Sequence, residues 1–182
     1  MSRITLIAII FSLFSNSFQS GAQTRELYDY LVKFDQFFKK GELKDAEGCL
    51  LKILGSKDSV SAEYLVIAYN DLGVVDNFLG KFDIALQYYH LAENVVIKNK
   101  LSSTHLAYIY INTGHIYTLK RSFPEAINYY EKGLRIYLDI KNPDKEIFHC
   151  ISTGYLDLGL TYNLIGDYKQ ALEYLVKSSS LK

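Results

Sequence analysis

The sequence predicts an all-α protein, built as a right-handed superhelical solenoid of about four helical hairpins. A short motif recurs four times, with its alanine at Ala46, Ala85, Ala126 and Ala171, and these alanines are 39, 41 and 45 residues apart. Between the motifs, apolar residues follow the three- and four-residue steps of a helix face. Only 2 prolines interrupt 182 residues, of which 49% are hydrophobic, so long regular elements are expected.

The first 22 residues are typical of a secretory signal peptide. Arg3 precedes an apolar run of 11 residues from Ile4 to Phe14, and Ser20, Gly21 and Ala22 would suit cleavage. A membrane-spanning helix needs about 20 apolar residues, so an uncleaved anchor, which would bring membrane contact, is the alternative. We expect an exported protein, periplasmic or secreted, with a solenoid over 23–182 in units of approximately 27–60, 63–100, 104–142 and 146–182.

Composition limits the kind of partner. The chain has 20 Lys plus Arg and 20 Asp plus Glu, scattered along its length, and a net charge of zero. Nucleic acid is disfavoured because phosphate contacts need a concentrated basic surface. Cys49 and Cys150 fall in the first and fourth units, so we expect two small buried side chains and no disulfide between them.

Each unit is expected to fold as two helices. In the second unit an apolar stripe runs over 63–79, and Gly80 then ends the helix by taking a positive φ. In the third unit Ser122, Pro124 and Glu125 predict a helix start with a side-chain cap. The aromatic residue after the glycine packs between the helices, and the motif alanine lies where their backbones come closest.

The motif residues resemble the tetratricopeptide repeat family. The fourth unit has Tyr155-x-x-Leu158-Gly159-x-x-Tyr162, followed by Gly166, Tyr168, Ala171 and Leu175 at the family's offsets. The second and third units match it similarly, whereas the first is degenerate and resembles a cap. Asp76, Arg121 and repeat periods above the usual 34 residues depart from the family pattern.

The resemblance implies a binding function. In that family the first helix of each repeat lines a concave groove that holds a protein or peptide. A ladder of amides there could bind an extended peptide backbone, and ordinary solvated polar residues are the alternative. The cationic half of the family's carboxylate clamp is missing, since Leu31, Asp35 and Tyr108 occupy the corresponding positions. The positions that match the groove contacts are Asn70, Asn77, Asn112, His115, Asp157 and Asn163.

No pattern in the sequence favours catalysis. His149 and Cys150 are adjacent, so on a helix they would point about 100° apart and could not act as base and nucleophile. His90, His105 and His115 lack metal-ligand spacing, and there is no phosphate-binding loop. We expect no metal and no cofactor, and we expect most of the 16 tyrosines to lie in the core.

The last helix carries a wide apolar stripe, with Ala171, Leu172, Leu175 and Val176. We expect this stripe to contact a second copy or a partner, unless the sequence is the front part of a longer protein. The leader and the tyrosine-rich repeats resemble the N-terminal part of bacterial envelope signalling proteins. The predicted function is therefore a scaffold or sensor module that binds a protein or peptide; the alternatives are an envelope assembly factor and, least favoured, an enzyme.

Overall fold

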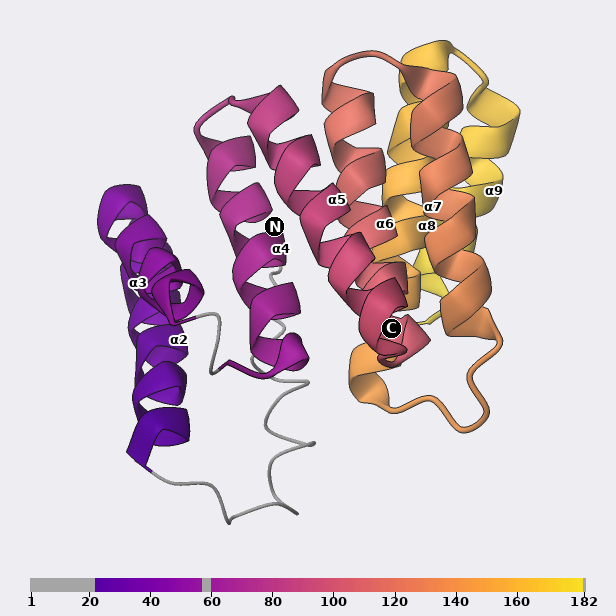
Figure 1. The fold of residues 1–182 in the computed structure, drawn as a ribbon. Helices are drawn as coiled ribbons and strands as arrows, with labels where there is room; N and C mark the ends of the chain where they lie inside the picture. Colours follow the sequence, from indigo (N-terminus) through magenta and orange to yellow (C-terminus); the bar gives the residue numbers. More distant parts are fainter. Residues whose placement is uncertain (1–21, 57–59, 182) are drawn as a thin grey trace. The chain divides into compact units, whose positions relative to one another are not determined.

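A computed structural model describes residues 22–56 and 60–181, and these residues form eight α-helices and no strand (Figure 1). Consecutive helices pair as hairpins. The hairpins form two compact units, one ending at Leu101 and the other beginning at Ser102. From here on, "unit" means one of these two groups of hairpins and not a single repeat. The predicted all-α class is confirmed. Most of the predicted leader lies in residues 1–21, outside the described part of the chain.

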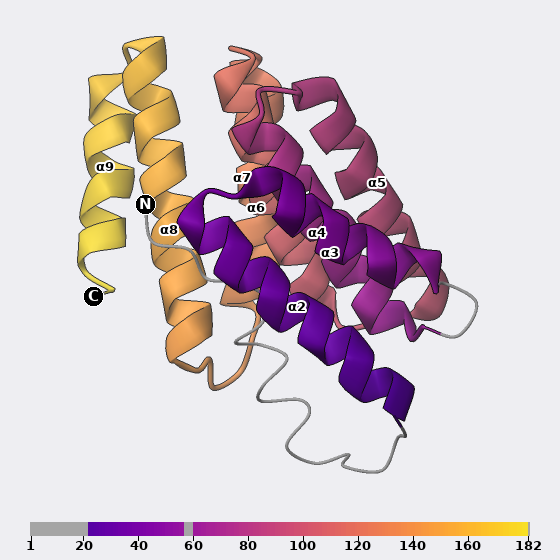
Figure 2. The same ribbon diagram turned by 90° about the vertical axis from the view of Figure 1, so that its left-hand side faces the viewer.

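The first unit contains two hairpins (Figure 2). α2 (Ala22–Lys40) pairs with α3 (Leu43–Gly55), α4 (Ala62–Phe78) pairs with α5 (Phe82–Asn99), and α3 packs on α4. Leu31, Leu50, Ile53, Ile67 and Leu72 are fully buried in this unit.

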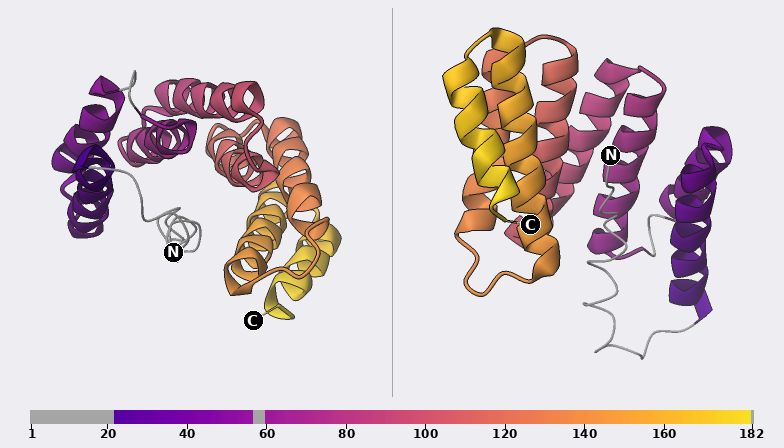
Figure 3. Two further views of the ribbon diagram at one scale, coloured as in Figure 1. Left: turned by 60° about the horizontal axis from the view of Figure 1, so that its bottom comes forward. Right: turned by 180° about the vertical axis from the view of Figure 1, so that it is seen from behind.

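The second unit also contains two hairpins, arranged in two layers (Figure 3). α6 (Ser103–Leu119) and α8 (Lys145–Ile165) form one layer, and α7 (Phe123–Leu138) and α9 (Tyr168–Ser179) form the other. Ile109, Ile116, Tyr130 and Leu158 are fully buried among these helices. The first helices of both hairpins therefore lie in one layer.

Tight turns join the helices of each hairpin. Gly80 has a φ of +72° and Gly166 a φ of +91°, so the predicted positive φ at Gly80 is confirmed. In the third hairpin Arg121 takes the same left-handed conformation, with a φ of +59°. The predicted cap at Ser122 is only half right: Ser122 occupies the N-cap position, but its hydroxyl accepts no hydrogen bond from the helix.

A glycine on the first helix lets an aromatic side chain of the second helix approach closely. A Cβ placed on Gly114 would lie 2.8 Å from Cδ1 of Tyr130 and 3.1 Å from the carbonyl oxygen of Ala126. Gly73 receives Tyr89 in the same way in the first unit. At this turn of the first helix, the missing Cβ therefore sets how closely the two helices of the hairpin pack.

Among the described residues, no helix is both long enough and apolar enough to span a bilayer.

Candidate protein-binding surface

The first helices of the second unit carry two equivalent stripes of side chains. On α6 the stripe is Asn112, His115 and Leu119. On α8 the residues 45 positions later form the equivalent stripe, which is Asp157, Leu160 and Leu164. The leucines are 45–53% exposed, whereas the polar members are half-buried. We call these six residues the α6/α8 wall: Asn112, His115, Leu119, Asp157, Leu160 and Leu164.

Hydrogen bonds hold the two helices of the wall together. The hydroxyl oxygens of Thr118 on α6 and Thr161 on α8 lie 2.9 Å apart. Thr118 also lies 3.2 Å from the Tyr130 hydroxyl on α7, and Thr161 donates a 2.8 Å hydrogen bond to the carbonyl oxygen of Asp157. Thr118 thus bonds between helices, whereas the equivalent position of the next hairpin, 45 residues later, is the exposed Asn163.

Asp157 is the unusual residue of the wall. Its carboxylate makes no hydrogen bond or ion pair within residues 22–56 and 60–181, although the residue is half-buried. Burial raises the pKa of this carboxyl to about 7, and the Asp157 charge adds to the burial that raises the pKa of Tyr130. Burial also lowers the pKa of His115, which is therefore neutral at pH 7.

Asn70 does not belong to a binding surface, so this prediction is wrong. It is 0% exposed on α4, and its Nδ2 donates a 3.1 Å hydrogen bond to Oδ1 of Asp71. The residue of α4 that corresponds to Asn112 and Asp157 is Asp71, because each lies 14 residues before the alanine of its motif. Asp71 is itself buried, with 5% of its surface exposed, so this position of α4 presents no counterpart of the half-buried Asn112 and Asp157.

The other predicted residues are more accessible. Asn112, His115 and Asp157 lie on the wall, and Asn163 is exposed beside Leu164 on α8. Asn77 is half-buried near the end of α4, in the first unit. Sequence reasoning missed the three exposed leucines, although the same 45-residue offset would have placed Leu119 and Leu164 together.

Most tyrosines lie at the edges of the hairpins, contrary to the prediction that they fill the core. Of the 16, only Tyr64, Tyr89, Tyr130 and Tyr137 are buried. Half-buried rings stack in pairs in the second unit, with centroids 5.4 Å apart for Tyr117 and Tyr129 and 5.5 Å apart for Tyr162 and Tyr174. The ammonium groups of Lys132 and Lys177 lie 5.0 and 4.9 Å from the centroids of Tyr129 and Tyr174.

The cysteines have the properties of core residues. Cys49 and Cys150 are both buried and unbridged. Burial raises the pKa of the Cys150 thiol to about 11, so at neutral pH it is protonated and a poor nucleophile. The described residues contain no group of three or more His, Cys, Asp or Glu side chains that could hold a metal ion.

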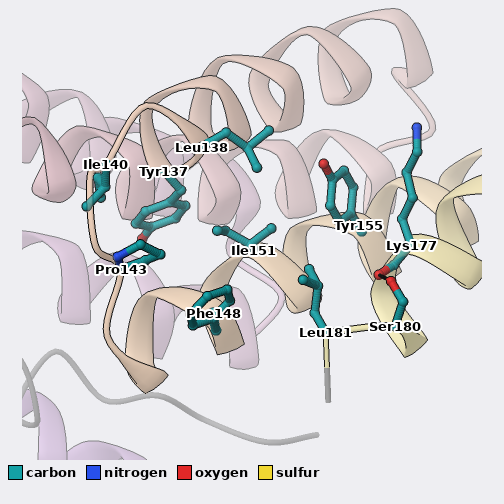
Figure 4. A pocket seen from close by; sticks show the side chains of 10 residues that line it. All are labelled: Tyr137, Leu138, Ile140, Pro143, Phe148, Ile151, Tyr155, Lys177, Ser180 and Leu181. Carbon is teal, nitrogen blue, oxygen red and sulfur yellow. Dashed lines mark hydrogen bonds between the residues drawn. The ribbon is translucent and has the colours of Figure 1, made fainter.

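An apolar pocket of about 330 Å³ opens at the other end of the second unit, where the α7–α8 loop meets the end of α9 (Figure 4). Its polar groups do not converge on a common point, because the Lys177 ammonium lies at the rim and bonds to Glu173 at 2.7 Å. The lining residues are Tyr137, Leu138, Ile140, Pro143, Phe148, Ile151, Tyr155, Lys177, Ser180 and Leu181.

The stripe predicted on the last helix is split by packing. Ala171 is buried against the hairpin, whereas Leu172 is 65% and Val176 56% exposed. Tyr168 extends the exposed part of the stripe, with 71% of its surface accessible. None of the described helices covers these three side chains.

Comparisons with known proteins agree with this architecture. The structure of BtubC (BKLC) from P. vanneervenii is similar, with a TM-score of 0.74, 18% identity, and coverage of 97% of this chain and 70% of that one. A structure of MamA is similar with a TM-score of 0.59, 20% identity, and coverage of 96% and 84%. These likenesses show the helical solenoid fold. No curated protein matches the chain.

Family models assign the repeats. Tetratricopeptide repeat models match residues 64–139 and residues 152–182, which together make up more than half of the chain. The chain belongs to the tetratricopeptide repeat family. Such repeats are typically protein–protein interaction modules, so the chain has the architecture of an interaction scaffold with a protein partner.

Proposed function

We propose that the chain is an exported scaffold or sensor module that holds a segment of a partner protein against the α6/α8 wall. The observation that carries this proposal is the pairing, on adjacent first helices, of exposed leucines with half-buried polar groups. Protein interfaces combine an apolar centre with a few placed polar groups, and the wall offers both. We propose that the chain is not an enzyme, because repeats of this family are typically interaction modules.

Export and envelope signalling are the biological setting that we propose. The predicted leader supports export, and the resemblance of the tyrosine-rich repeats to the N-terminal part of envelope signalling proteins supports signalling. A structural function in envelope assembly is the alternative. Neighbouring genes for a kinase or regulator would favour signalling, and neighbouring envelope-assembly genes would favour the alternative.

A capture experiment with matched variants tests the wall. The bait variant carries Asn163→Arg and Leu164→Arg, because both side chains are exposed and the changes should not disturb the core. The control carries Gln87→Arg and Asn128→Arg, which add the same charge at exposed positions on α5 and α7. Circular dichroism verifies that all three proteins are folded.

We expect a specific partner in an envelope extract to be retained by the unchanged protein and by the control, and to be lost by the Asn163→Arg, Leu164→Arg variant. Equal capture by all three proteins would show that the wall is not the binding surface. The exposed stripe on α9 would then be the next surface to test.

A further inference from the structure

The wall itself carries no lysine or arginine. α6 has no Lys, Arg, Asp or Glu along its whole length, and after Lys145 and Glu146 the only charged residue of α8 is Asp157. The second helices of the two hairpins, α7 and α9, do carry cations, among them Lys132, Arg135 and Lys169. The wall is therefore a neutral surface with a single negative charge.

That charge has no ion-pair partner among the residues that the structure describes. A carboxylate that loses part of its hydration without gaining a partner destabilises the folded protein, and folded proteins generally pair such groups. Two cations of the second helices have other partners: Lys177 on α9 bonds to Glu173, and Lys132 on α7 lies over Tyr129. A cation from outside the chain would supply the missing interaction.

We propose that Asp157 binds a cationic side chain, of lysine or arginine, in the partner segment that lies on the α6/α8 wall. This inference rests on the proposed function of the wall. Leu160 and Leu164 follow Asp157 by three and seven residues on α8, so all three lie on one face of the helix. The two leucines would cover the aliphatic stem of the bound side chain while the carboxylate pairs with its charged head.

Protonation gives this site a characteristic pH dependence. The titratable groups on neighbouring helices include Tyr130 on α7, which interacts with the Asp157 charge, His115 on α6, and Tyr174 with the Glu173–Lys177 pair on α9. Since burial holds the pKa of Asp157 near 7, the ion pair strengthens as the pH rises through neutrality. By linkage, a bound cation lowers that pKa, which a merely structural carboxyl would not show.

The probe is a fluorescent peptide of about twelve residues with lysine at every third position among serine and alanine, and a second peptide with glutamine in place of lysine. Fluorescence anisotropy gives their affinities at about pH 8 and about pH 5.5, where lysine stays charged and Asp157 changes its charge. The proteins compared are the unchanged chain, Asp157→Asn, and Asp139→Asn. Asp139 is exposed after α7, away from the wall, so the control makes the same chemical change.

We expect the lysine peptide to bind about tenfold more tightly at pH 8 than at pH 5.5, and the glutamine peptide to show no such difference. Asp157→Asn should remove the difference and Asp139→Asn should keep it. In a carboxyl ¹³C titration, the lysine peptide should lower the pKa of Asp157 by about one unit, the shift that corresponds to a tenfold preference for the ionised form.

The proposal is overturned if the unchanged protein binds neither peptide, if both peptides bind equally, or if Asp157→Asn binds the lysine peptide as the unchanged protein does. The captured partner separates this failure from failure of the proposed function. If the partner is lost by the Asn163→Arg, Leu164→Arg variant but kept by Asp157→Asn, the wall remains the binding surface and the cationic contact is wrong.

Discussion

At the scale of single residues, burial of the Asp157 carboxyl links folding to protonation. Its pKa is about 7 in the folded protein and about 3.9 in an unfolded chain. Between these values the folded state holds a proton that the unfolded state has lost, so this residue makes stability fall as the pH rises from about 4 to 7. We expect Asp157→Asn to raise the free energy of unfolding by about 1–2 kcal/mol at pH 8, and to leave it unchanged near pH 4.

Denaturant unfolding across this pH range measures the effect, and Asp139→Asn is the control. The difference between the unchanged protein and each variant isolates the substituted carboxyl from His115, whose lowered pKa acts in the opposite direction. A pH-independent effect of Asp157→Asn would mean that the carboxyl is solvated in the folded protein.

At the scale of a helix pair, a glycine determines how closely the two helices pack. Gly114→Ala places a methyl group against the Tyr130 ring and the Ala126 carbonyl, so we expect a loss of about 1–3 kcal/mol of stability. Gly48 in α3 is also helical but has no atom within 4 Å of the added Cβ, so Gly48→Ala should stabilise by about 0.5–1 kcal/mol. Thermal denaturation compares the two variants, and equal effects would show that the Tyr130 ring moves aside at little cost.

At the scale of the whole molecule, zero net charge and an apolar stripe on α9 favour association near neutral pH. We expect sedimentation at pH 7 to show an average mass that rises with concentration, and Leu172→Glu to reduce this rise. Ile97→Glu adds the same charge on α5, at a side chain that is 59% exposed, and should have a smaller effect. A strictly monomeric protein at every concentration would show that the stripe does not mediate self-association.

The fold could be predicted because it repeats. A four-fold motif with helical apolar steps leaves few arrangements other than stacked hairpins, and the positive φ of Gly80 follows from the same pattern. The exchange of Asn70 for Asp71 shows where such reasoning fails. Neighbouring residues on a helix point about 100° apart, so an error of one position assigns a side chain to the wrong face of the helix.

The surface itself was harder to predict, because residue type does not tell how exposed a side chain is. Tyrosine occurs both in cores and at partly solvated positions, and only the packing shows that Tyr117 and Tyr129 are half-buried. The raised pKa of Asp157 likewise depends on the helices around it. The sequence shows that a carboxyl is present, but it does not show how much of that carboxyl's hydration the fold removes.

The stacked tyrosine pairs also give the protein a built-in optical signal. The chain has no tryptophan, so its ultraviolet emission comes from tyrosine alone. The pairs of Tyr117 with Tyr129 and of Tyr162 with Tyr174 hold their rings nearly parallel, at interplanar angles of 13° and 8°, in an asymmetric setting that should give a near-ultraviolet circular dichroism band. A tryptophan in a bound peptide would be the only indole in the complex, and its emission could be excited selectively and followed without any label on the protein.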